Sequence, residues 1–120
     1  MTDDASGAPP TRNLLSPLPP PGADEAVTTL LQRPGVRLER IVSNGQASPP
    51  GFWYDQDEAE WVLVLAGAAR LEIEGEAAAR TLAPGDSLFL PARCRHRVAW
   101  SDPHAPTVWL ALFLAGQEPG

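Results

Sequence analysis

The segment that decides the fold is PGDSLFLPARCRH, residues 84–96. Pro84 and Gly85 predict a tight turn, because proline presets one backbone angle and glycine accepts a positive one. An apolar run follows and ends at Pro91, and His96 opens another apolar run. Short apolar runs that are separated by turn residues are typical of short antiparallel strands. The chain has only one other histidine, so a metal bound at His96 would need other residue types as ligands.

Similar runs extend on both sides of this segment. Alternating or fully apolar patterns predict strands at residues 36–43, 61–65, 69–75, 87–91, 96–100 and 107–114. Between the second and third of these strands we expect a hairpin turn, at residues 66–68. With about seven or eight strands in all, the sequence predicts an all-β fold, a single-domain antiparallel β-barrel or double-stranded jelly roll, because closure removes exposed sheet edges.

Residues 24–33 have a different spacing. Val27, Leu30 and Leu31 are placed like one face of a helix, and Asp24 can cap its start. We therefore expect one or two helical turns before the first strand.

The composition divides the chain into three parts. Residues 1–25 hold six prolines and few large apolar groups. Such a composition cannot offset the entropy of ordering, so a largely flexible N-terminal arm is expected there. The barrel is expected to span residues 26–116, followed by a tail at residues 117–120.

Charge and cysteine content exclude several classes of protein. The formal net charge of -6, with nine arginines and no lysine, argues against a nucleic-acid binder. Neither a secretory signal nor a run of about 18 apolar residues is present, so we expect a cytoplasmic protein without a membrane span. Cys94 is the single cysteine, which fits a reducing compartment. The arginines on either side of it should lower the pKa of its thiol.

The segment from Gly85 to His96 resembles the second of two conserved segments of the cupin superfamily. Gly85, Pro91 and His96 stand where that family has a glycine, a proline and a histidine. Arg93 replaces the family's inner glycine. The resemblance implies the barrel fold over roughly residues 36–114.

Residues 53–67 resemble the family's first segment, in which two histidines precede a glutamate and a glycine. Glu60 and Gly67 match the last two of these. The two histidine positions hold other residues, Tyr54 and Gln56 or, with the alternative spacing, Trp53 and Asp55.

The resemblance implies a site inside the barrel where three histidines and a glutamate hold a divalent metal. Here Gln56, Glu60 and His96 are the candidate ligands for iron, manganese, nickel or zinc. Tyr54 and Gln56 would face the same side of an extended segment, so all four side chains could converge. The alternative is a hydrogen-bonded cluster that orients an organic ligand. The sequence leaves both readings open.

Large aromatic side chains are expected to line the same pocket, because small-molecule sites are mostly apolar. The candidates are Trp53, Tyr54, Trp61 and Trp100, with Phe52 and Trp109 beside them.

Two functions follow from this site. The first is binding of a small polar metabolite or sugar-like ligand. The alternative is a metal-dependent enzyme of the dioxygenase or isomerase class acting on a small carbonyl, enol or sugar, with Glu60 or Tyr54 moving a proton. The apolar run at residues 107–114 further predicts a homodimer, through strand pairing or sheet packing.

Overall fold

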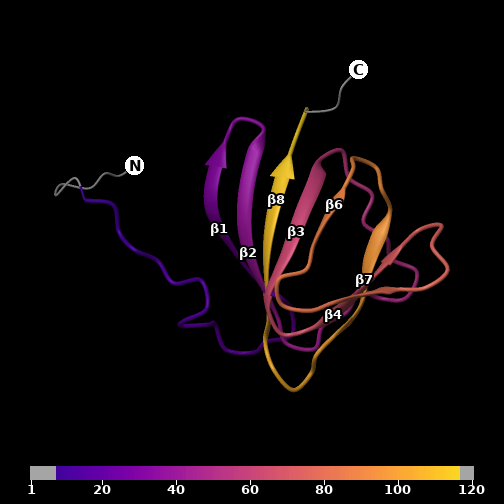
Figure 1. Ribbon diagram of the computed structural model, residues 1–120, viewed down its shortest axis with the longest axis horizontal. Helices are drawn as coiled ribbons and strands as arrows, with labels where there is room; N and C mark the ends of the chain where they lie inside the picture. The colour runs from indigo at the N-terminus through magenta and orange to yellow at the C-terminus, as the bar shows by residue number, and fades with distance from the viewer. Residues whose placement is uncertain (1–7, 117–120) are drawn as a thin grey trace.

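The computed structural model describes residues 8–116 and consists of two antiparallel sheets that face each other (Figure 1). The strands are β1 (Ala26–Arg33), β2 (Val36–Ser43), β3 (Ala59–Ala66), β4 (Ala69–Ile73), β5 (Arg80–Leu82), β6 (Ser87–Leu90), β7 (His96–Ser101) and β8 (Thr107–Leu114). Five strands form one sheet in the order β1-β2-β8-β3-β6, and three form the other in the order β5-β4-β7. The predicted all-β jelly-roll barrel is confirmed.

The helical turns expected at residues 24–33 are wrong, because this segment is the edge strand β1. Its backbone groups pair along β2, and a register shift lies between Thr29 and Leu31. The shift breaks the alternation of side chains, which is why Leu30 and Leu31 were spaced like a helix face. The threonines that precede the shift are β-branched and favour a strand.

The hairpin expected at residues 66–68 is also wrong, because β3 and β4 belong to different sheets and do not pair. Gly67 is the corner, with a φ of 88°. A Cβ atom at this position would lie 2.5 Å from the Cα atom of Thr107, so only glycine allows the chain to cross so close to β8.

The core lies between the two sheets. On β8, Trp109, Ala111 and Phe113 point inward and are buried, while Leu110 and Leu112 alternate with them on the outer face. The inner side chains pack with residues of the other strands, including Val62, Val64, Leu71, Leu82 and Leu90.

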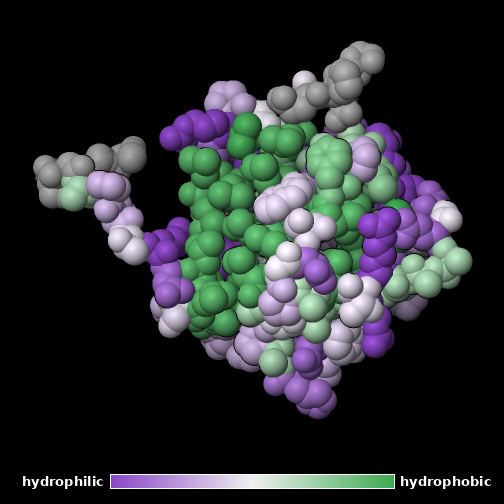
Figure 2. All heavy atoms as spheres, viewed as in Figure 1, coloured by the Kyte–Doolittle hydropathy of each residue, from purple (hydrophilic) through white to green (hydrophobic). Residues whose placement is uncertain are grey.

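The outer face of the five-stranded sheet is apolar as well. Leu112 pairs with Leu38 of β2 on one side and with Trp61 of β3 on the other. Trp61 in turn pairs with Phe89 of β6, which is 53% exposed. Figure 2 shows a continuous apolar surface over β1, β2 and β8.

Residues 8–25 contain no strand, and hydrogen bonds hold them against the barrel. Arg40 donates from Nη1 to the carbonyl of Leu14 at 3.2 Å, and Gln46 donates from Nε2 to the carbonyl of Gly22 at 2.9 Å. The expected tail at 117–120 and the first seven residues of the arm lie outside the described residues. No helix in the described part of the chain is long and apolar enough to cross a membrane.

Candidate functional site

A polar cluster lies inside the barrel where β3 and β7 begin. Glu60 of β3 and His96 of β7 are only 8% and 4% exposed. The Nε2 atom of His96 lies 3.4 Å from Oε1 of Glu60, and Gln56 donates from Nε2 to the same oxygen at 3.2 Å. The ring of Tyr54 stacks on that of His96, with centroids 5.3 Å apart. The four side chains that the sequence suggested would converge are therefore together.

The backbone explains this convergence. Tyr54 and His96 exchange two backbone hydrogen bonds, of 2.7 and 3.2 Å, as in an antiparallel bridge. The carbonyl of Gln56 accepts a third bond, from the amide of Arg93 at 2.8 Å. The segment before β3 thus runs beside β7 as a short added strand, which fixes Tyr54 next to His96.

The protonation of His96 depends on the partners of its two ring nitrogens. Nδ1 lies 2.8 Å from the carbonyl of Cys94, which can only accept, so Nδ1 carries a proton. Burial lowers the pKa of His96, but the bond to Glu60 and the bond to the Cys94 carbonyl outweigh it, and the pKa is raised overall. The raised pKa favours the protonated ring, in which both nitrogens donate.

The pKa of Tyr54 is raised too, first by burial and then by the charges of Glu25 and Glu60. The phenol therefore stays protonated and can donate a hydrogen bond.

The sequence reading missed Arg37, which lies on the inner face of the sheet. Glu60 and Arg37 both pair with the inward-pointing Phe113 on β8, one from each side. The guanidinium lies 4.3 Å above the ring of Phe113. It donates to Glu39 at 2.8 Å and to both oxygens of Glu58, at 2.8 and 3.1 Å.

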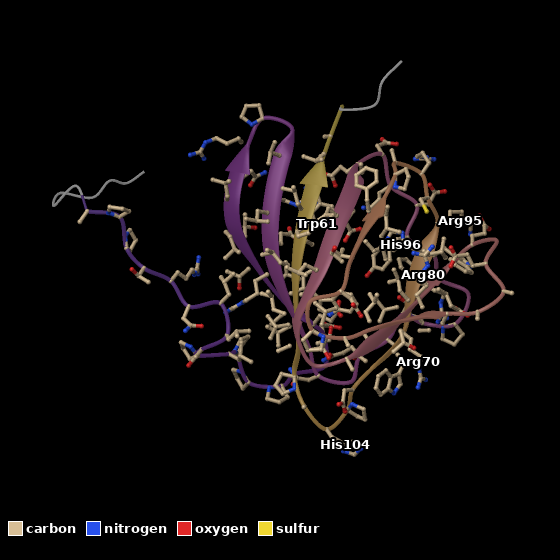
Figure 3. The ribbon with its side chains drawn as sticks, in the orientation of Figure 1. Trp61, Arg70, Arg80, Arg95, His96 and His104 are labelled. Atoms are coloured by element: carbon tan, nitrogen blue, oxygen red, sulfur yellow. The ribbon has the colours of Figure 1, made fainter. Side chains whose placement is uncertain are left out.

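Most of the aromatic residues expected in the pocket lie elsewhere. Trp61 follows the inward Glu60, so it points outward, and Trp100 pairs with Arg70 on the outer face of the small sheet, with the guanidinium 4.8 Å from its ring. Figure 3 labels Trp61, Arg70 and His96 on these elements. The pocket role predicted for Trp61 and Trp100 is therefore wrong.

Trp53 departs from the prediction as well. Its ring lies 5.7 Å from the guanidinium of Arg95, which pairs at the surface with Glu74. Trp53 thus lies beside Arg95, on the side away from the cluster. Of the four aromatic residues proposed for the pocket, only Tyr54 belongs to the cluster.

The thiol of Cys94 also departs from expectation. Burial, followed by the charge of Glu76, raises its pKa instead of lowering it. The neighbouring arginines point away, Arg93 toward Asp55 and Asp57 and Arg95 toward Glu74.

A pocket of about 460 Å³ opens beside this cluster, between the start of β1 and residues 46–54. Its walls include Glu25, Val27, Ser48, Phe52, Tyr54 and Val98. The carboxylate of Glu25 accepts a hydrogen bond from Ser43, whose oxygen accepts another from Trp109 Nε1 at 3.0 Å. Tyr54 belongs to both the pocket and the cluster, so it connects the entrance to His96.

The residues present do not form a conventional metal cage. Gln56 directs its amide nitrogen at Glu60, and His96 directs Nε2 at the same carboxylate oxygen. One imidazole, one carboxylate and one neutral amide are a weak donor set, and here they bond to one another. Within residues 8–116 no group of three or more His, Cys, Asp or Glu side chains is placed to hold a metal ion.

The model of the Cupin domain family matches residues 39–113. The chain belongs to the cupin family. A crystal structure from Ralstonia eutropha JMP134, of a protein provisionally named as a mannose-6-phosphate isomerase, is 53% identical in sequence, with a TM-score of 0.87. The match covers 90% of this cupin and 100% of that protein.

Two more distant structures share the fold. A cupin superfamily protein from Desulfitobacterium hafniense DCB-2 is 19% identical, with a TM-score of 0.71 over 89% of this chain and 94% of that one. A Cupin 2 conserved barrel domain protein from Salinispora arenicola CNS-205 is 22% identical, with a TM-score of 0.66 over 91% of each chain. No curated protein sequence matches significantly.

Proposed function

We propose that this cupin binds a small polar metabolite, sugar-like in its hydroxyl content, beside Gln56, Glu60 and His96. The observation that carries the proposal is the buried pair of Glu60 and His96 beside Tyr54, whose ring stacks on His96 and also lines an open pocket. A buried ion pair is seldom a net source of stability. A pair kept beside a pocket is better explained by the ligand that it contacts.

Each residue has a distinct part in this binding. Glu60 accepts hydrogen bonds from ligand hydroxyls, and the protonated His96 holds that carboxylate in place. Tyr54 keeps its phenolic proton, because its pKa is raised, and donates at the junction of pocket and cluster. Gln56 offers an amide that can donate or accept.

A second candidate is an isomerase acting on a small carbonyl or sugar substrate. It is favoured by the name of the Ralstonia protein and by the 3.4 Å distance between Nε2 of His96 and Oε1 of Glu60. In this reaction Glu60 would remove a proton from carbon and His96 would donate one to the carbonyl oxygen. Gln56, Glu60 and His96 remain the proposed ligands for iron, manganese, nickel or zinc if such an ion takes part.

Calorimetric titration with mannose and with fructose tests the binding proposal. We expect binding that weakens about tenfold or more in Glu60→Gln, which removes a charged acceptor without changing its shape. The matched control is Glu76→Gln, because Glu76 pairs with Arg80 at the surface. If the folded protein bound neither mannose nor fructose, the proposal would be contradicted.

The isomerase candidate is tested by NMR of mannose 6-phosphate incubated with the protein, with and without added Mn²⁺. Conversion to the ketose that disappears in Glu60→Gln and persists in Glu76→Gln would make the second candidate the function. Elemental analysis of protein purified without a chelating tag, beside His96→Gln, reports whether a metal is held.

A further inference from the structure

The pocket beside Tyr54 carries charge of one sign. Asp24 and Glu25 are on its wall, and none of the described residues that line it is an arginine or a histidine. Both acids lie at the end of the N-terminal arm, where Gln46 binds the carbonyl of Gly22 and holds the arm against the pocket. An anionic group entering this pocket would meet two carboxylates and no counter-charge.

Several cations of the barrel are engaged by carboxylates. Arg37 is engaged by Glu39 and by both oxygens of Glu58, and His96 is engaged by Glu60. Arg97 lies at the pocket wall, where it donates to the carbonyls of Ser48 and Pro49, and it is engaged by Glu72. Asp24 and Glu25 therefore give the pocket a field that attracts positive charge.

The apolar part of the wall has the form that organic cations prefer. The rings of Phe52 and Tyr54 meet edge to face, with centroids 4.9 Å apart and planes at 86°. Val27, Phe52 and Tyr54 are 56%, 43% and 37% exposed, so a concentrated apolar surface stands open to solvent in this pocket. Aromatic faces bind ammonium groups through the negative charge of the ring face.

We propose that the pocket binds an organic cation, an amine, quaternary ammonium or sulfonium group, between Phe52, Tyr54 and the carboxylates of Asp24 and Glu25. The volume of about 460 Å³ suits a small metabolite. The ligand is then an amino alcohol or a related cationic polyol, whose hydroxyl end reaches Glu60 and His96. This last step rests on the proposed function, whereas the cation pocket itself does not.

The test compares choline with 3,3-dimethylbutan-1-ol, an uncharged alcohol of nearly the same shape, by calorimetric titration. We expect choline to bind at least about tenfold more tightly, because the two probes differ mainly in charge. Phe52→Leu and Glu25→Gln should each weaken choline binding about fivefold. Phe89→Leu is the matched control, since Phe89 is exposed on the outer sheet face.

The outcomes separate this inference from the function on which it builds. Equal binding of the two probes, no binding of choline, or loss of choline binding in the Phe89 control would overturn the cation pocket. Choline binding that survives Glu60→Gln unchanged, in a protein that binds neither mannose nor fructose, would uphold the pocket and overturn the sugar-like reading of the cluster. Sugar binding without choline binding would do the opposite.

Discussion

The two faces of the five-stranded sheet are made by alternate residues of the same strands, and both carry apolar side chains, but the inner face also carries a group of paired charges. The inner face carries Arg37, Glu39 and Glu60, each bonded to a partner of opposite charge or to a hydrogen-bond donor. The outer face carries Leu38 and Leu112 as a cross-strand pair. Burying charge costs free energy even when it is paired. The paired charges of the inner face are the basis of the proposed ligand site, and the apolar outer face is where we propose that a second copy of the chain packs.

The largest expected effect is on the outer face, where we propose that a second copy of the chain packs. Leu112→Asp should weaken the homodimer at least a hundredfold, because it places a charge at the centre of an apolar interface, at about 3 kcal/mol. Sedimentation equilibrium measures the change. Thr81→Asp, on exposed β5 of the other sheet, is the control and should leave the mass unchanged. If the wild-type protein had the mass of one chain at micromolar concentration, the proposed homodimer would be wrong.

The next effect is on the inner face. Glu60→Leu alone should destabilise the fold by about 3 kcal/mol, because His96 is left buried without its partner. The double variant Glu60→Leu, His96→Leu should recover most of that loss and bind no sugar. Urea unfolding and calorimetry measure the two properties. If the double variant were as unstable as the single one, the pair would serve the fold and not the ligand.

The sequence could predict six of the eight strands, all but β1 and β5, but not which face of each strand is buried. Turn residues bound the runs at 87–90 and 96–101, so those elements were found. Alternation separates Arg37 from Leu38, but apolar residues were assigned to the inside by default, and the outer face is apolar here. For the same reason Trp61 and Trp100 were placed in the pocket. Tyr54 and Gln56 lie beside His96 and Glu60, at the positions given by one of the two spacings of the cupin segment.

Other features could not be found from a pattern because they depend on pairing between distant segments. The register shift in β1 is visible only once β2 lies beside it, so the period of two was hidden. Glu25 enters the pocket because the arm is held at Gly22, a contact with Gln46 that no local spacing encodes.

A smaller effect is expected from pH. The pKa of His96 in the folded chain is raised above its ordinary value of 6.5, so the pair contributes fully below that pH. Its contribution is lost as pH rises through the folded pKa, and stability should decline on the alkaline side of 6.5. Thermal unfolding across pH 6 to about 9 tests this, with His96→Gln showing a flatter curve. His104→Gln, in an exposed turn, should keep the wild-type profile.

The smallest effect is expected for the outer face of the three-stranded sheet. Trp100→Leu removes the stacking with Arg70 and should cost about 0.5 kcal/mol in urea unfolding. Its affinity for mannose and for choline should equal that of the wild type, because Trp100 points away from the interior. A loss of affinity would show that the two sides of this sheet are coupled.

Tyr54 is the single tyrosine of the chain, and it stands where the pocket meets the cluster. Biosynthetic incorporation of 3-fluorotyrosine would therefore give one ¹⁹F resonance for the whole protein, with no assignment needed. The chemical shift of this resonance would respond to a ligand in the pocket and to the charge state of the neighbouring His96 imidazole. The site thus supplies its own spectroscopic probe, one that can be read before any ligand is known.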